Sequence, residues 1–263
     1  MNVYDEIVSC FDLKKGDRIW LSTEIIKLAL KFKKKELIFD GNELINTFQN
    51  AVGENGTIMI PTFSFKFSNE KRYDISNTRG TTGALGNIAM QRTDFSRTQH
   101  PMHSFEVWGK DKERLASMNN LHSFGIDSPF GYCLRNHVRQ IILGTDYVHA
   151  MTFVHYAEVT CNVPYRFAKS FTGEYITAEG ISEIRTYDYA ARKLEIEPEE
   201  RFNRIGVILE ENGISKKLNI DGVECYNIDL AKSYPLICKD ILENNCGNIY
   251  DFNISREEVF AVH

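Results

Sequence analysis

Three short apolar runs, separated by segments with helical spacing, constrain the fold of this chain most strongly. The runs are Arg18–Ser22, Gly56–Thr62 and Arg139–Gly144, and Pro61 closes the second of them. A short continuous apolar run bounded by turn residues is typical of a strand that is buried on both faces. Such strands alternating with helices predict an α/β fold, in which a layered sheet carries flanking helices.

Apolar residues at helical spacing predict helices in the segments around these strands. Val3–Phe11 precedes the first run, and Ile25–Leu30 and Glu43–Val52 follow it. Thr81–Gly86 is typical of a helix start in which a threonine hydroxyl accepts hydrogen bonds from first-turn amides. The stretch from Thr62 to Gly80 has no clear period, and long irregular segments of this kind are often functional.

The last hundred residues have a different pattern, which predicts a β-rich C-terminal layer. Arg204–Glu210 is interpreted as a strand, and Leu218–Val223 contains a hairpin-like Asp-Gly pair. A helix is expected over Asp229–Asn244, and Ser255 is a candidate helix cap. Because there is no internal repeat or low-complexity linker, we interpret residues 1–263 as a single domain.

Composition and charge exclude several classes of protein. Apolar residues make up 43% and charged residues 25%, as in ordinary globular proteins. No run approaches the roughly 18 apolar residues of a membrane span, and the N-terminus does not resemble a signal peptide, so we expect a cytoplasmic protein without a membrane partner. The net charge of −5 argues against a nucleic-acid partner. The six cysteines form no C-x-x-C pair, which disfavours a zinc knuckle or redox dithiol.

The strongest local signal for chemistry is the pair His155 and Glu158. On a helix, a histidine three residues before a glutamate lets the carboxylate bind the imidazole, fix its tautomer and raise its basicity. This arrangement suits a general base. A surface pair without a catalytic role fits the same spacing. A metal pair is less well supported, because no further ligands with matching spacing are visible.

Two other segments could bind a ligand. The stretch Ser96–Ser104 combines hydroxyls, two histidines and an arginine beside a proline, a mixture suited to phosphate or thioester groups, although a self-stabilised polar turn has the same composition. Ser22 and Thr23 follow the first buried strand, and ligands in α/β folds bind beyond the carboxyl ends of strands. A simple helix cap is the alternative for these two hydroxyls.

Taken in order, motifs from residue 16 to residue 166 resemble the aminoglycoside 3-N-acetyltransferase family. They are Gly16-Asp17 with Ile19-Trp20-Leu21-Ser22-Thr23, then Met59-Ile60-Pro61-Thr62-Phe63-Ser64, Thr82-Gly83-Ala84-Leu85-Gly86, Arg97-Thr98-Gln99-His100-Pro101-Met102-His103-Ser104, Ser128-Pro129-Phe130-Gly131, Leu143-Gly144 and His155-Tyr156-Ala157-Glu158. Each motif alone is modest, but the ordered series is specific.

The resemblance implies an antibiotic N-acetyltransferase-like fold and a CoA-dependent N-acyltransferase that uses acyl-CoA, with acetyl-CoA or a longer or hydroxyacyl-CoA as donor and no metal. Carried over by position, His155 is the catalytic base, and Glu158 is its partner or an acid of the acceptor site. The CoA and thioester region is expected to be lined by Ser22, Thr23, Arg97, His100 and Ser104. A hydroxyl such as that of Ser104, or a backbone amide near Ser22, is a candidate to stabilise the oxyanion.

One departure from the family pattern bears on the acceptor. Where aminoglycoside-modifying members have Asp-x-Asn-Thr, this chain has His149-Ala150-Met151-Thr152, so only Thr152 matches. Cations and aromatic side chains that could serve a phosphate-bearing acceptor occur elsewhere, at Arg72, Tyr73, Arg79, Tyr165 and Arg166. We therefore expect a dTDP- or UDP-linked amino sugar as acceptor, within surface polysaccharide synthesis such as that of lipopolysaccharide.

Two alternatives to this function stay open. The chain could be an aminoglycoside 3-N-acetyltransferase that confers antibiotic resistance, or a non-catalytic ligand-binding or scaffold protein, against which the presence of both His155 and Glu158 argues. Whether the protein acylates a nucleotide-linked sugar or an aminoglycoside, its partner is a small-molecule amino-sugar acceptor. The sequence does not fix the oligomeric state, and a homodimer is compatible with it.

Overall fold

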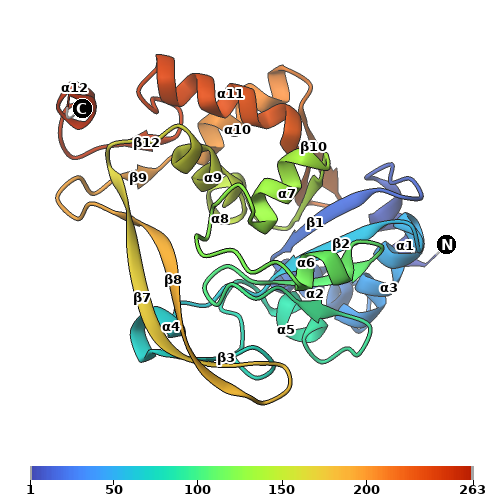
Figure 1. The fold of residues 1–263 in the computed structure, drawn as a ribbon. Coiled ribbons are helices and arrows are strands. Elements are labelled where there is room, and N and C mark those ends of the chain that lie inside the picture. Colours follow the sequence, from blue (N-terminus) through green and yellow to red (C-terminus); the bar gives the residue numbers. More distant parts are fainter. Residues whose placement is uncertain (1, 262–263) are drawn as a thin grey trace.

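The computed structural model describes residues 2–261, and its centre is a seven-stranded mixed sheet (Figure 1). The three apolar runs form its core: β1 pairs in parallel with β2 on one side and with β6 on the other. Antiparallel strands extend the sheet at both edges, in the order β10-β11-β6-β1-β2-β5-β4. The strands are β1 (Arg18–Thr23), β2 (Thr57–Pro61), β4 (Ser96–Arg97), β5 (Phe105–Gly109), β6 (Arg139–Leu143), β10 (Ser215–Ile220) and β11 (Val223–Asp229).

Side chains alternate between the two faces of this sheet and enter two separate cores. On one face, Trp20, Met59 and Ile142 join a core with Phe105 and Phe130. On the other, the neighbouring strand residues enter a second core, which includes Ile19, Leu21, Ile58, Ile60, Ile141 and Leu143. Burial on both faces explains why these strands are continuous apolar runs in the sequence.

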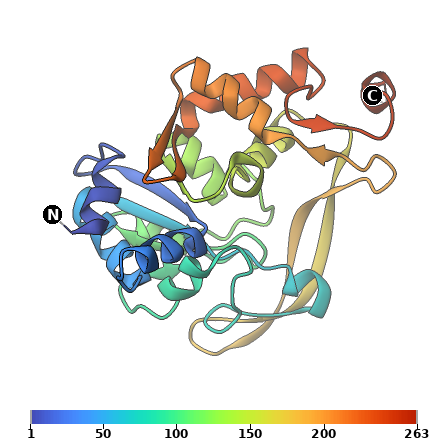
Figure 2. The same ribbon diagram turned by 180° about the vertical axis from the view of Figure 1, so that it is seen from behind.

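Helices cover both faces, so the α/β layering expected from the sequence is confirmed (Figures 1 and 2). The second core is covered by α1 (Val3–Ser9), α2 (Ile25–Lys34), α3 (Gly41–Val52) and α5 (Ala84–Ala89). The first core is covered by α6 (Lys112–Ala116), α7 (Pro129–Arg135), α8 (Tyr147–Ala150), α9 (Phe153–Thr160), α10 (Phe202–Glu211) and α11 (Leu230–Glu243).

A long hairpin lies beside the main sheet and was not expected from the sequence. Its strands β7 (Arg166–Ile176) and β8 (Ser182–Arg192) run from the region of α9 to β3 (Arg72–Asp74) and α4 (Lys66–Glu70), as Figure 1 shows. β3 pairs in parallel with β7. The stretch 62–80 is therefore only partly irregular, because it contains α4 and β3.

The C-terminal segment contains both strands and helices. The interpretation of Arg204–Glu210 as a strand is wrong, because this segment belongs to α10. Phe202, Ile205 and Leu209 are buried at helical spacing, and Gly206 lets the ring of Tyr147 approach to where a Cβ atom would clash. The Asp221-Gly222 turn does join β10 to β11. β9 (Glu199–Glu200), which precedes α10, pairs in antiparallel fashion with β12 (Tyr250–Asp251). α12 (Arg256–Phe260) follows β12, and Ser255 caps it as expected.

The helix start at Thr81–Gly86 is also confirmed, but its threonines do not cap it. Gly83 is the N-cap of α5 and provides no side chain. Thr81 Oγ1 instead donates to the carbonyl of Phe63, and Thr82 Oγ1 accepts from the backbone N–H of Phe63. The two threonines thus tie the end of β2 to the start of α5. Along residues 2–261, no helix is both long and apolar enough to cross a membrane.

Candidate active site

Helix α9 presents the two residues that the sequence singled out. Its Phe153, Val154, Tyr156 and Ala157 are buried in the first core, which fixes the helix against the sheet. On a helix, residues three apart share a face, so His155 and Glu158 lie together. The side chain of His155 is 16% exposed and that of Glu158 is fully buried.

The carboxylate of Glu158 binds the imidazole of His155 directly. Nδ1 of His155 lies 2.7 Å from Oε2 of Glu158, while the hydroxyl of Tyr165 donates to Oε1 at 2.7 Å. Burial alone raises the pKa of Glu158, but the charge of Arg166 and the contacts with His155 and Tyr165 outweigh it and hold the pKa at about 2. An ionised carboxylate accepts only, so Nδ1 of His155 carries the proton and Nε2 is left as the basic nitrogen.

Arg166 completes this cluster from the start of β7. Its Nε lies 2.7 Å from Oε2 of Glu158, and its Nη2 lies 3.0 Å from Nδ1 of His155. Nη1 donates to the carbonyl of Ala190, and Nη2 also donates to the hydroxyl of Tyr250. The side chain of Arg166 is only 4% exposed. The interpretation of Tyr165 and Arg166 as acceptor-facing residues is therefore wrong, because both are buried and bind Glu158.

Aromatic rings hold the imidazole of His155 from two sides. The ring centroids of Phe124 and Phe202 lie 5.7 and 5.8 Å from that of His155, both nearly edge-on. Phe124 in turn contacts His103, which stacks on Tyr189. Burial, together with nearby positive groups, lowers the pKa of His103 well below its ordinary value, so this imidazole is neutral. The sequence places His103 in the Ser96–Ser104 stretch, but the family resemblance implies no individual role for it.

A pocket of about 270 Å³ opens where the central strands end, one helical turn from His155. Ser22 and Thr23 close β1 there, and Thr152 lies three residues before His155. The structure therefore brings these three predicted residues together at the carboxyl ends of β1, β2 and β6. The other lining residues are Trp20, Glu24, Pro61, Phe63, Thr81, Thr82, Gly83, Thr145, His149 and Ala150.

Two side chains that line this pocket, Ser22 and Trp20, each retain a hydrogen-bond donor without a partner in the described part of the chain. The amide of Gln140 donates to Ser22 Oγ at 3.1 Å and to the carbonyl of Ala150 at 2.8 Å. Since Ser22 Oγ accepts this bond, its own proton can be donated into the pocket. The indole Nε1 of Trp20 is buried and has no hydrogen-bond partner among residues 2–261.

A second, larger hollow of about 730 Å³ adjoins the pocket and shares Glu24, Thr145 and His149 with it. Helix α2 places Lys27, Lys31 and Lys34 along this hollow. Lys31 binds Asp221 at 2.7 Å, and Glu24, Asp146 and Glu224 also line the hollow. Lys27 and Lys34 are therefore the cations that remain for an anionic group.

The structure does not bring Arg97, His100 and Ser104 to the pocket that Ser22, Thr23 and Thr152 line. Arg97 donates to the carbonyls of Thr62, Ile75 and Thr78 and to Ser104 Oγ, so its guanidinium holds the segment 62–80. Ser104 Oγ donates to the carbonyl of Thr62 at 3.1 Å. These contacts occupy the groups that were expected to bind a thioester or phosphate.

His100 contacts the hairpin instead of the pocket. Its Nδ1 accepts from the backbone N–H groups of Met102 and His103, and its Nε2 lies 3.3 Å from the carbonyl of Asp188. Burial lowers the pKa of His100 to about 3. The imidazole is therefore a neutral structural link between the segment 100–103 and β8.

The expected acceptor residues Arg72, Tyr73 and Arg79 are dispersed. Arg72 is exposed and lies 3.4 Å from Glu174 on the hairpin. Tyr73 is buried under the guanidinium of Arg97, with its hydroxyl 3.4 Å from Ser104 Oγ. Arg79 lines a surface hollow beside α5. They form no common cationic surface at His155.

Among residues 2–261, no group of three or more His, Cys, Asp or Glu side chains is arranged to hold a metal ion. His155 and Glu158 contact each other and the guanidinium of Arg166 rather than further metal-binding groups. This arrangement of groups fits proton transfer.

Comparisons with known proteins agree with the family resemblance and with the fold. The family model described as aminoglycoside 3-N-acetyltransferase matches residues 33–238. The SPbeta prophage-derived aminoglycoside N(3')-acetyltransferase-like protein YokD of Bacillus subtilis is 26% identical over 229 residues, covering 78% of this chain and 81% of YokD.

Two solved structures share the fold at low sequence identity. AAC-IIIb, in a binary complex with CoASH, aligns with a TM-score of 0.78 and 16% identity over 92% of this chain and 95% of its own. AAC-VIa bound to sisomicin aligns with a TM-score of 0.74 and 15% identity over 92% and 96%. Since the family model spans most of the sequence, the chain belongs to the aminoglycoside 3-N-acetyltransferase family.

Proposed function

We propose that this protein transfers an acyl group from acyl-CoA to an amine of an amino-sugar acceptor, with His155 as general base. The observation that carries the proposal is the contact between His155 and Glu158: Nδ1 of His155 lies 2.7 Å from Oε2 of Glu158, so Nε2 is the basic nitrogen. His155 stands three residues after Thr152, which lines the pocket at the strand ends. A base positioned in this way removes the proton that an attacking amine must lose.

We place acyl-CoA in the two adjoining hollows. The pantetheine arm enters the pocket lined by Ser22, Thr23 and Thr152, and the phosphates lie against Lys27 and Lys34 of α2. The CoASH complex of the similar AAC-IIIb supports this choice of donor. Lysine ammonium groups are common ligands of phosphates.

The reaction needs no covalent enzyme intermediate. The neutral amine forms a C–N bond to the thioester carbonyl while Nε2 of His155 takes its proton. The C–S bond then breaks, and the departing CoA thiolate takes the proton held on Nε2 of His155, which restores the neutral imidazole. The free hydroxyl proton of Ser22 is the side-chain donor that we assign to the oxyanion. Holding both substrates beside His155 supplies further acceleration through proximity.

For the acceptor, we favour an aminoglycoside over a nucleotide-linked amino sugar. The nucleotide-sugar hypothesis relied on cations that could face a phosphate-bearing acceptor. Arg72 pairs with Glu174 on the hairpin, Arg79 lines a separate hollow beside α5, and Arg166 is bound to Glu158. The similar AAC-VIa binds sisomicin, which supports the aminoglycoside. The absence of the family's acidic residue at position 149 is the one sequence feature that still favours the nucleotide sugar.

Release of free thiol from acyl-CoA tests both parts of this proposal. Wild-type protein is assayed with acetyl-CoA and longer acyl-CoAs against sisomicin, other aminoglycosides and dTDP- or UDP-amino sugars. We expect turnover with aminoglycosides and a loss of roughly 10²- to 10⁴-fold in kcat/KM for His155→Ala.

The matched control is His137→Asn, at an exposed histidine, which keeps wild-type rates. Full activity of His155→Ala would remove the general-base assignment. Turnover with nucleotide sugars alone would show that the acceptor is a dTDP- or UDP-linked amino sugar, and it would leave the proposed acyl-transfer chemistry unchanged.

A further inference from the structure

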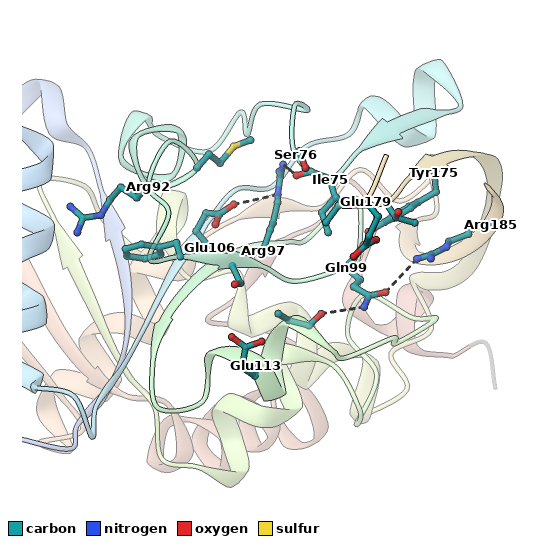
Figure 3. Close-up of a pocket in the computed structure, with 16 residues that line it drawn as sticks. Ile75, Ser76, Arg92, Arg97, Gln99, Glu106, Glu113, Tyr175, Glu179 and Arg185 are labelled. Carbon is teal, nitrogen blue, oxygen red and sulfur yellow. Dashed lines mark hydrogen bonds and ion pairs between the residues drawn. The ribbon is translucent and has the colours of Figure 1, made fainter. Parts of the chain in front are cut away.

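A separate cavity of about 530 Å³ lies at the β4–β5 edge of the main sheet (Figure 3). Its walls come from the segment after α5, from α6 and from the far end of the β7–β8 hairpin. Phe105 and Val107 of β5 point into the core that adjoins His155. Because side chains alternate along a strand, Glu106 between them points to the opposite face, so this cavity is distinct from the candidate active site.

Glu106 is the notable residue of this cavity. Its side chain is only 6% exposed, and its carboxylate accepts no hydrogen bond from any residue in the range 2–261. The nearest cationic atom is Nε of Arg97 at 3.9 Å, which is too far for a hydrogen bond. The N–H groups of Arg97 are directed to carbonyls and to Ser104 Oγ instead. A buried carboxylate without donors is costly to the fold.

The other cations that line the cavity are already engaged. Arg92 binds Asp94 at 2.9 Å, and Arg185 binds Glu183 at 2.7 Å while its guanidinium stacks over Tyr175. Glu113 and Glu179 add exposed carboxylates at the rim. Among the lining arginines only Arg97 is paired with Glu106, as Figure 3 shows, and it lies beyond hydrogen-bond distance, so within residues 2–261 the carboxylate of Glu106 still lacks a hydrogen-bond donor. Burial raises the pKa of Glu106 to about 7, consistent with an incompletely compensated carboxylate.

The chemistry of the walls narrows the class of ligand. Glu106 is the single deeply buried carboxylate of the cavity, and no group of three metal-binding side chains occurs within residues 2–261, so a bound metal ion is disfavoured. Met90, Phe95, Ile75 and Ala116 provide apolar surface around it. Apolar walls with one buried acid suit an alkylammonium group, whose N–H donors satisfy the carboxylate while its carbon chain contacts the walls.

We propose that this cavity is a second binding site, which takes a small organic ammonium ion on the carboxylate of Glu106. The site lies on the face of the sheet opposite His155, and it does not depend on the acyl-transfer function.

Methyl NMR of protein labelled with ¹³C at the methionine methyl groups tests the proposal, because Met90 lines the cavity. The probe is n-propylammonium chloride, and n-propanol serves as its uncharged analogue. We expect a saturable shift of the Met90 signal with the ammonium ion and none with the alcohol. Glu106→Gln weakens binding by about tenfold or more, the effect of losing one charge-assisted hydrogen bond.

Two further variants keep the test decisive. Ala116→Met places a larger side chain in the cavity and keeps Glu106, and it must also abolish the shift, even where Glu106→Gln proves too unstable to study. Glu211→Gln, at an exposed glutamate of α10, must bind as the wild type does. An unmoved Met90 signal in the wild type, or equal affinity in Glu106→Gln or Ala116→Met, overturns the proposal.

Discussion

At the residue scale, Glu158 determines how the candidate active site is arranged. It is fully buried, yet it contacts the imidazole of His155, the hydroxyl of Tyr165 and the guanidinium of Arg166. A buried carboxylate with three such partners is stable only as part of the whole cluster. The same contacts that keep Glu158 ionised orient His155, so the structural and catalytic roles of this residue are coupled.

This coupling predicts the behaviour of Glu158→Gln. Removing the charge leaves Arg166 buried without its anion, which is expected to cost about 3–5 kcal/mol of unfolding free energy at pH 7. The pKa of Glu158 is held at about 2 in the folded protein, below its ordinary value near 4.5. The contribution of the Glu158 charge to folding stability is therefore complete above about pH 4.5 and is lost as the pH falls towards 2.

Urea unfolding at pH 7 and at pH 3 measures this effect. The difference between Glu158→Gln and wild type must shrink at the lower pH. Glu113→Gln, at an exposed side chain, is the control and must show no comparable difference. A constant difference at both pH values would show that the charge of Glu158 is not the cause.

Ser22 carries a prediction about stabilisation of the oxyanion. Ser22→Ala removes a hydroxyl that accepts from Gln140 and is free to donate its own proton into the pocket. Because the oxyanion exists only in the transition state, loss of this donor is expected to lower kcat by roughly 10²-fold and to leave the KM for acyl-CoA nearly unchanged. A rise in KM with unchanged kcat would contradict the oxyanion assignment. Initial rates over a range of acyl-CoA concentrations, with the exposed Ser117→Ala as control, separate these outcomes.

Local spacing predicted one contact of the site and missed another. Helix geometry alone places His155 beside Glu158, and the structure confirms this contact. Arg166 binds the same carboxylate from the start of β7. Residue spacing does not specify the direction of the turn between α9 and β7, so this contact could not be predicted. Arg97 and Ser104 belong to a loop, and composition does not reveal that their donors are used by neighbouring backbone carbonyls.

At the element scale, the β7–β8 hairpin is held to the body of the protein close to the site. The backbone N–H of Ser123 donates to the carbonyl of Asp188, and the N–H of Asp188 donates to the carbonyl of Leu121. Ser123 Oγ also lies 3.0 Å from Nδ1 of His103 and 3.3 Å from Nε2 of His100. The next residue, Phe124, packs against His155, so this attachment connects the hairpin to the candidate base.

We therefore expect Ser123→Ala to loosen the hairpin. The variant loses the hydroxyl that lies between the two histidines, and hydrogen–deuterium exchange should accelerate at residues 121–124 and 187–190. Ser182→Ala, at the exposed far end of the same hairpin, should leave these peptides unchanged. Equal exchange in all three proteins would mean that the backbone pairing alone holds the hairpin in place.

The sequence indicated buried strands better than it indicated exposed ones. β1, β2 and β6 are buried on both faces, and their apolar runs make them visible. Much of β7 is exposed, including Phe167 and Lys169, so it carries no alternation from which a strand could be inferred. In α10 the apolar cluster within Arg204–Glu210 suggests a strand, although Phe202, Ile205 and Leu209 follow helical spacing.

At the scale of the whole molecule, the parallel arrangement of the central strands assembles the site. Their carboxyl ends bring Ser22, Pro61 and Thr145 to one pocket, although these residues are far apart in the sequence. The rule that ligands bind at such ends made this part of the site predictable. The cavity around Glu106 was not predictable, because it depends on how the hairpin lies against the sheet edge.

The whole molecule also buries histidines that must charge when it unfolds. Burial lowers the pKa of His100 to about 3, and His103 is shifted in the same direction. The unfolded chain binds a proton at His100 below about pH 6.5, whereas the folded protein does not. The contribution of His100 to stability is therefore complete above that pH and is lost as the pH falls towards 3. Between pH 7 and pH 5 the loss is about 2 kcal/mol.

Between pH 7 and pH 5, protonation of Glu106 stabilises the folded protein, whereas protonation of His100 in the unfolded chain destabilises it. The raised pKa of Glu106 means that the folded protein takes up a proton as the pH falls, so wild-type stability alone does not isolate the histidines. In His100→Gln the Glu106 contribution is unchanged, and the stability lost from pH 7 to pH 5 should be smaller by about 2 kcal/mol than in wild type. His137→Asn, at an exposed histidine, should match the wild type. Parallel pH dependence in all three proteins would place the acid sensitivity of the fold elsewhere than at His100.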